Sequence, residues 1–168
     1  MALSMYEVTV PVFVRGLKVL AALLTKAEQH VEQRGSVPDA MISARLADDM
    51  LPLSAQVQRA SDTSKMSVER LSGVPAPKFD DNETSFDQLR QRIDNTIAYL
   101  ESVPAGHFDG SEQRTITLNF GGFPDFTGAS YLLTFALPNF YFHVATAHDI
   151  LRNQGVPVGK RDYLGMFV

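Results

Sequence analysis

The sequence predicts a mostly helical protein, an all-α four-helix bundle with a small β-hairpin between its third and fourth helices. Two observations carry this prediction. Four long segments each have one apolar stripe at helical spacing, and a short stretch between the last two segments alternates with period two instead. A chain of 168 residues falls in the size range of one domain, so residues 1–168 are expected to form a single helical-bundle domain.

The first helix is predicted from about residue 9 to about residue 33. Pro11 is tolerated there because a proline in the first turn removes no helical hydrogen bond. Gly35 is a typical helix stop. A short helical turn is expected next, around Met41 to Leu46. The apolar stripe of the first helix consists of Phe13, Leu17, Leu20, Leu24 and Ala27.

The second helix is predicted to start near Asp49, with Pro52 early in it, and to run to Ser72. Gly73 and the prolines that follow it cannot continue a helix, so they end this one. Its stripe contains a polar amide among apolar and small residues: Leu53, Gln56, Ala60, Ser64, Val68 and Leu71.

The third helix has a clear start, because Thr84 followed by Asp87 is similar to a capping box. Its stripe is Phe86, Leu89, Ile93, Ile97 and Leu100, and Pro104 and Gly106 close it.

Beyond the third helix, residues 115–120 alternate between polar and apolar, and Gly121 and Gly122 then lead into residues 123–127, which predicts a small hairpin. The last helix is expected from about Ser130 to Gln154. The tail, residues 158–168, is partly apolar and is expected to dock on the bundle.

Composition and charge exclude several classes of function. Fifteen basic and nineteen acidic residues give a net charge of −4, without a Lys/Arg cluster, so nucleic acid is not an expected partner. No secretory signal is visible at the N-terminus, and Arg15 and Lys18 interrupt the most apolar segment, so a membrane is not expected either. The expected location is the cytoplasm. The chain has no cysteine, which leaves histidine, carboxylate, amide and hydroxyl groups for chemistry.

The candidate site residues face the predicted core. Asn139 and His143 share a face of the last helix, and Gln56 stands in the stripe of the second. An unpartnered buried polar group costs about 1–3 kcal/mol, so these three should bond to each other, to water or to a ligand. Asp62 is either a solvated helix carboxylate or reaches the same cavity. His148 lies on another face and is interpreted as a surface or interface residue.

Several separated stretches resemble one known family, DUF1993, a bacterial family of unknown function in the DinB/YfiT-like helical-bundle superfamily. The resemblance covers nearly the whole chain. The stretches that carry it are Tyr6–Leu17, Arg45–Met50, Gln56–Asp62, Lys78–Thr84 and Leu137–His143.

The resemblance implies the bundle fold and a comparison with the metal site of the superfamily. That site has three histidines, one from the second helix and an H-x-x-x-H pair from the last. Here His143 matches the second histidine of the pair, Asn139 stands at the first, and Gln56, give or take a residue, replaces the histidine of the second helix. Amide oxygens are weak ligands for zinc or nickel, so the site is interpreted as a degenerate metal site and no cofactor is expected. A divalent metal at His143 is the alternative.

Two classes of function remain open at this point. The first is a small-molecule binding or catalytic bundle, whose cavity is lined by Gln56, Asn139, His143 and Asp62, with His143 as the best candidate for a general base. The second is a non-catalytic structural or interaction protein that acts as a homodimer. The sequence does not decide whether the chain is an enzyme.

Overall fold

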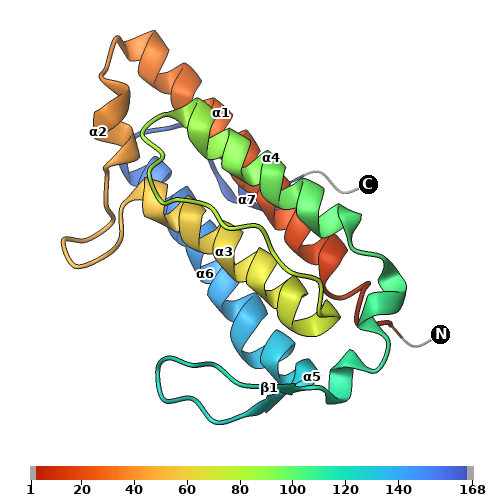
Figure 1. The fold of residues 1–168 in the computed structure, drawn as a ribbon. Helices are drawn as coiled ribbons and strands as arrows, with labels where there is room; N and C mark the ends of the chain where they lie inside the picture. The colour runs from red at the N-terminus through yellow and green to blue at the C-terminus, as the bar shows by residue number, and fades with distance from the viewer. Residues whose placement is uncertain (1–2, 166–168) are drawn as a thin grey trace.

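The computed structural model describes residues 3–165, and four long helices lie side by side in this part of the chain (Figure 1). They are α1 (Val10–Arg34), α3 (Leu53–Ser72), α4 (Phe86–Ser102) and α6 (Leu137–Asn153). The closest packing joins α3 to α6 and to α4, and α1 to α4 and to α6. The order around the bundle is therefore α1, α4, α3, α6, which confirms the predicted four-helix plan.

Helix α1 has the predicted stripe on its buried face and ends at Gly35, which takes the left-handed conformation. It packs tightly on α6 because Gly16 has no side chain. A Cβ atom at Gly16 would lie 2.3 Å from Cε1 of the fully buried Phe140, whose ring also packs edge-on against Phe13. Within residues 3–165, no helix has the length and apolar character needed to cross a membrane.

The connection between α1 and α3 differs from the prediction. The short helix α2 (Pro38–Ile42) starts and ends earlier than the turn expected around Met41 to Leu46. Helix α3 begins at Leu53 rather than near Asp49, because Pro52 is its N-cap residue with extended backbone. A proline disfavours helical backbone in the residue before it, so the helix cannot extend back through Leu51.

Helix α4 starts with a different cap from the predicted pair of Thr84 and Asp87. Ser85 is the N-cap, and its hydroxyl accepts a hydrogen bond from the Gln88 backbone N–H at 3.2 Å. The Gln88 side chain in turn accepts a bond from the Thr84 backbone N–H at 2.6 Å. The capping is therefore shifted by one residue along the chain. The predicted stripe is buried, with Ile97 at its edge.

Two short 3-10 helices, η1 (Ala105–Phe108) and η2 (Ser111–Gln113), lead from α4 to the hairpin. The hairpin is antiparallel as predicted, but its strands β1 (Thr115–Ile116) and β2 (Phe126–Thr127) are much shorter than expected. Its loop turns through Gly121 and Gly122, both with positive φ. The rings of Phe120 and Phe123 pack on Phe135 instead of extending the sheet.

The last helical run begins earlier than Ser130. It consists of α5 (Gly128–Ser130), the π-helical segment η3 (Tyr131–Ala136) and α6. The π segment lies just before Pro138, whose missing N–H interrupts the regular hydrogen-bond pattern.

The chain then returns to α1 through α7 (Lys160–Leu164), where Lys26 on α1 and Asp162 on α7 form an ion pair of 2.5 Å. The expected docking of the tail is thus seen as far as residue 165. Residues 166–168 of that tail lie outside the described part.

Candidate functional site

The four candidate residues from the sequence lie in two different places on α3 and α6. Gln56, Asn139 and His143 meet where α3 packs on α6, a region called here the α3–α6 seam. Asp62 also stands on α3, but its ion pairs are with Arg92 on α4 and with Lys65 on α3 itself. The structure therefore brings together the three residues related to the superfamily site and places the fourth in a separate network.

His143 is held by a chain of two hydrogen bonds. Its Nδ1 lies 2.8 Å from Oε1 of Gln56, and Nε2 of Gln56 donates to the Leu51 carbonyl at 2.9 Å. Only the nitrogen end of an amide can donate to a carbonyl, so the oxygen end of Gln56 must face the histidine. The imidazole therefore carries its hydrogen on Nδ1, and Nε2 is left as an acceptor.

The imidazole of His143 is neutral at physiological pH. Burial, together with the positive charge of Arg59, lowers its pKa from 6.5 to about 4. The side chain of Gln56 is 1% exposed and the whole of His143 is 9% exposed, so water screens these groups poorly. A neutral imidazole with a fixed tautomer is a hydrogen-bond acceptor at Nε2.

Asn139 is one turn before His143 on α6, and its Nδ2 donates to Oγ1 of Thr63 on α3 at 2.8 Å. This bond leaves the Asn139 carbonyl oxygen as the second acceptor of the seam. Both bonds across the seam join α3 to α6, which is the most extensive helix pair of the bundle. His143 therefore bonds to Gln56, one of the partners expected from the sequence, whereas the partner of Asn139 is Thr63.

The donor set of the seam does not fit the three-imidazole metal site of the superfamily. Both ends of the Gln56 amide are occupied by His143 and Leu51, and His143 is the imidazole of the seam. In residues 3–165, no group of three His, Cys, Asp or Glu side chains is arranged to hold a metal ion. Imidazole and thiolate are the ligands that transition metals prefer, so we derive no chemistry through a metal here.

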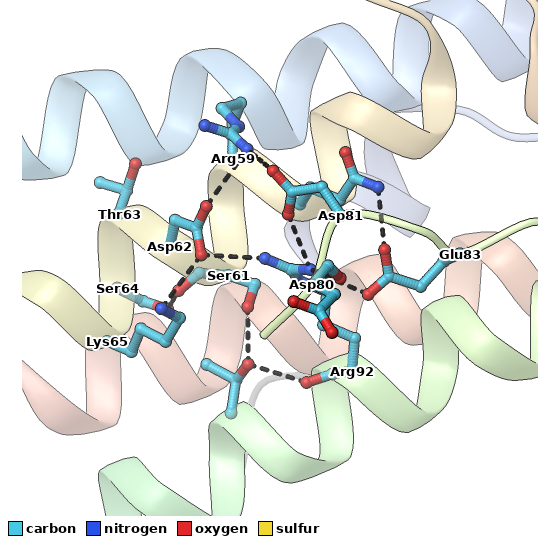
Figure 2. A network of polar contacts seen from close by, with 12 residues as sticks. Arg59, Ser61, Asp62, Thr63, Ser64, Lys65, Asp80, Asp81, Glu83 and Arg92 are labelled. Carbon is cyan, nitrogen blue, oxygen red and sulfur yellow. Dashed lines mark hydrogen bonds and ion pairs between the residues drawn. The ribbon is translucent and has the colours of Figure 1, made fainter. Parts of the chain in front are cut away.

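The second network surrounds the buried guanidinium of Arg92 on α4 (Figure 2). Its two terminal nitrogens contact Asp62 at 2.9 Å, Glu83 at 2.8 Å and Asp81 at 3.0 Å, and one also donates to the Asp80 carbonyl. The side chain is 1% exposed. Burial lowers the pKa of Arg92, but the bond to Glu83 and the nearby carboxylates outweigh this effect and raise it.

Three carboxylates face three cations in this network. Lys65, which is buried, lies 3.2 Å from Asp62, and Arg59 contacts both Asp62 and Asp81. The cationic groups of Lys65 and Arg92 also lie over the ring of Phe79, at 5.3 and 5.4 Å from its centroid. The loop of residues 78–83, called here the strap, is thus bound along the groove between α3 and α4.

Deeper in the same groove, the hydroxyls of Ser61 on α3 and Thr96 on α4 lie 2.7 Å apart, and Thr96 also donates to the Arg92 carbonyl. Gln58 donates to Glu83 at 2.8 Å, which adds a further link from α3 to the strap. Figure 2 shows these side chains converging from α3, α4 and the strap.

Sequence reasoning missed this second network. A usable signal was present in the stripe of α4, because Arg92 stands three residues after the buried Leu89 and four before the buried Thr96. A cation at a buried position needs carboxylates nearby.

The other histidines lie apart from the seam. Nδ1 of His148 is 2.9 Å from Oδ1 of its neighbour Asp149, and its ring packs edge-on near Tyr163 of α7. His107 is exposed in η1. His30 is half-buried near the end of α1. No group shared with Gln56 or His143 links these residues to the seam in the described part of the chain.

Comparison with family models matches residues 5–164 to the family described as Domain of unknown function (DUF1993). Among solved structures, the crystal structure of a DinB family member protein from Shewanella denitrificans is similar to this chain, with a TM-score of 0.92 and 41% sequence identity. The match covers 97% of this chain and 93% of that one. A search of curated proteins found no match. The family resemblance and the bundle fold expected from the sequence are both confirmed.

The first prediction concerns Arg92. Replacing Arg92 by methionine leaves Glu83 without a cation and removes one cationic partner each from Asp62 and Asp81, so the free energy of unfolding should fall by about 3–5 kcal/mol. The matched control is Arg90→Met on the same helix, whose partners Glu28 and Asp87 are on the surface and whose loss should cost about 1 kcal/mol or less. Urea unfolding measures the loss of unfolding free energy in both variants. Equal, small losses would show that the strap carboxylates do not need Arg92.

The second prediction concerns His143 and pH. The folded chain has a pKa of about 4 at His143, against 6.5 for the free side chain, so between these values the unfolded chain binds a proton that the folded chain does not. The contribution of His143 to the free energy of unfolding is complete above pH 6.5 and is lost as the pH falls towards 4. The loss amounts to about 3 kcal/mol at most.

Urea unfolding between about pH 7 and pH 4 tests this, with His143→Asn as the comparison. Asparagine can keep a donor towards Gln56 but does not titrate. The other carboxylates and histidines titrate in both proteins, so the difference between the two profiles isolates His143. Identical profiles would contradict the prediction.

Proposed function

Because the chain belongs to the DUF1993 family, whose function is unknown, its activity has to be inferred from its own site, and we propose that it binds a small molecule at the α3–α6 seam. The observation that carries the proposal is the geometry of His143. Gln56 occupies Nδ1 and fixes the tautomer, which leaves Nε2 as an acceptor without a hydrogen-bond partner in residues 3–165. A ligand for this atom must bring an O–H or N–H donor.

The surroundings of His143 narrow the chemistry of the ligand. The carbonyl oxygen of Asn139 is a second acceptor one turn away on the same helix. The ring of Phe142 is 53% exposed and packs edge-on on the imidazole, with 5.3 Å between the centroids. Binding sites for small molecules typically combine such an apolar wall with a few placed polar groups. A compact molecule with a hydroxyl or amide group and an apolar part fits this pattern.

The same geometry favours binding over acid–base catalysis. A general base works best when its pKa is close to the working pH. The pKa of His143 is lowered to about 4, so its imidazole takes up a proton poorly at neutral pH. Gln56 is neutral and cannot stabilise an imidazolium as a carboxylate partner would. His143 is therefore proposed as a ligand-contacting residue, with catalysis as the less favoured role.

Exposed apolar side chains favour a second candidate function, a structural or interaction protein that acts as a homodimer. Phe120, Phe123, Leu133 and Phe142 are each 43–61% exposed. Large exposed apolar residues that gather on a surface are typical of interaction sites. In this candidate the bonds of Gln56 and Asn139 serve only to fix the packing of α3 on α6.

The third prediction tests both the tautomer of His143 and the proposed contact between its Nε2 and a ligand. Nitrogen NMR of histidine-labelled protein at pH 7 should show His143 neutral and protonated at Nδ1, although free imidazole side chains favour the other tautomer. Benzyl alcohol and benzamide, which combine a donor with a ring, should shift the Nε2 signal in a saturable way. The same probes should not bind the His143→Asn variant, which keeps the bond to Gln56 and lacks the Nε2 acceptor.

The matched control is His148→Asn, on the same helix and outside the seam, which should bind the probes as the unchanged protein does. Protonation of His143 at Nε2, or probe shifts that are the same in the His143→Asn variant, would contradict the proposed contact.

The fourth prediction tests the homodimer. Analytical ultracentrifugation at micromolar concentration should give twice the chain mass of 18.5 kDa, and Phe142→Asp should reduce it to the mass of one chain. A buried charge at an interface is costly, so one substitution suffices. The control is Val37→Asp, an exposed apolar residue at the other end of the bundle, which should leave the mass unchanged. A single-chain mass for the unchanged protein would remove this candidate.

A further inference from the structure

A groove of about 900 Å³ lies on the outer side of α1, away from the seam. It is bounded by α7 and by Glu101 at the end of α4. Its apolar walls come from α1 and from the turn before it: Tyr6, Val10, Pro11, Val14, Val19 and Ala22. Pockets for small molecules in proteins usually have a volume of about 300–1,000 Å³ and mostly apolar walls, so this groove has the size and character of a binding site.

The groove is a built feature of the fold, because α7 is fastened beside α1. Lys26 pairs with Asp162 at 2.5 Å, and Arg15 donates to the Leu164 carbonyl. After α7 the backbone of Gly165 passes so close to α1 that a Cβ atom there would lie 2.8 Å from Cγ2 of Val19. Gly165 also has a φ of +70°, which disfavours other residues. These contacts fix one wall of the groove.

The charges around the groove are mainly positive. Three cations line it, Arg15, Lys18 and Arg161, together with two acidic residues. The acidic residues are engaged within the protein: Asp162 is bound by Lys26 and by the Gly159 backbone N–H at 2.8 Å, and Glu101 lies 4.0 Å from Lys18. The whole chain has a net charge of −4, whereas the charged residues that line the groove have one positive charge in excess.

We propose that this groove binds a medium-chain or long-chain fatty acid. The alkyl chain would lie along the valines of α1, and the carboxylate would meet the cationic rim at Arg161, because Lys18 is shared with Glu101. An apolar groove alone would accept many occupants, but positive charge beside it selects an amphiphile with an anionic head. The inference is independent of the proposed function, because none of the groove residues belongs to the seam.

Isothermal titration calorimetry of the full chain with octanoate, decanoate and dodecanoate, each below its micellar concentration, tests the proposal. We expect saturable binding of one molecule per chain, tightening about three- to fourfold for each added CH₂ group. Decanol, which has a similar alkyl chain without the charge, should bind at least about fivefold more weakly than decanoate.

Two variants and one control locate the site. Ala22 is exposed on the groove wall, so Ala22→Glu should weaken dodecanoate binding at least tenfold without unfolding the helix. Arg161→Glu should weaken it about five- to tenfold and reduce its salt dependence. Lys160→Glu, a neighbouring exposed cation outside the groove, should bind like the unchanged protein. His143→Asn should also bind dodecanoate normally, which separates this test from that of the seam.

Four results would overturn the proposal. The first is the absence of saturable dodecanoate binding, and the second is equal affinity for all chain lengths. The third is binding only after the chain is shortened to residue 165, which would show that its own last residues compete for the groove. The fourth is a dimer that Ala22→Glu dissociates and that does not bind dodecanoate, which would assign the groove to a second copy of the chain.

Discussion

The buried guanidinium of Arg92 is the interaction on which the arrangement of α3, α4 and the strap depends. A charge that is 1% exposed is stable only where opposite charges surround it, and here they come from α3 through Asp62 and from the strap through Asp81 and Glu83. The strap has no regular secondary structure of its own. Its path along the bundle is therefore set by these ion pairs and by the packing of Phe79 against the cations.

Arg59 connects this charged network to the neutral seam. It contacts Asp62 and Asp81 on one side, and its charge helps to keep the imidazole of His143 neutral on the other. Helix α3 thus carries two polar surfaces of different character. The surface towards α4 bears Asp62 and Lys65, whose charges pair with each other and with Arg92. The surface towards α6 bears the Gln56 amide and the Thr63 hydroxyl, which bond to His143 and Asn139 of α6.

The seam could be predicted from the sequence because helical periodicity fixes which residues share a face. Gln56 stood among apolar residues of one stripe, and Asn139 and His143 stood one turn apart on another, so their meeting followed once the two helices were neighbours. The network around Arg92 could not be predicted in the same way. Its carboxylates come from a loop, and the path of a loop relative to a helix is not encoded in a period.

The sequence by itself determined the number and order of the long helices, their buried faces and the family, because apolar spacing and helix stop signals act locally along the chain. The tertiary structure alone decided the tautomer of His143, the separation of Asp62 from the seam, and the groove between α1 and α7. Each of these depends on distances between segments far apart in the chain. Such distances are set by the packing of the whole bundle, which no local pattern specifies.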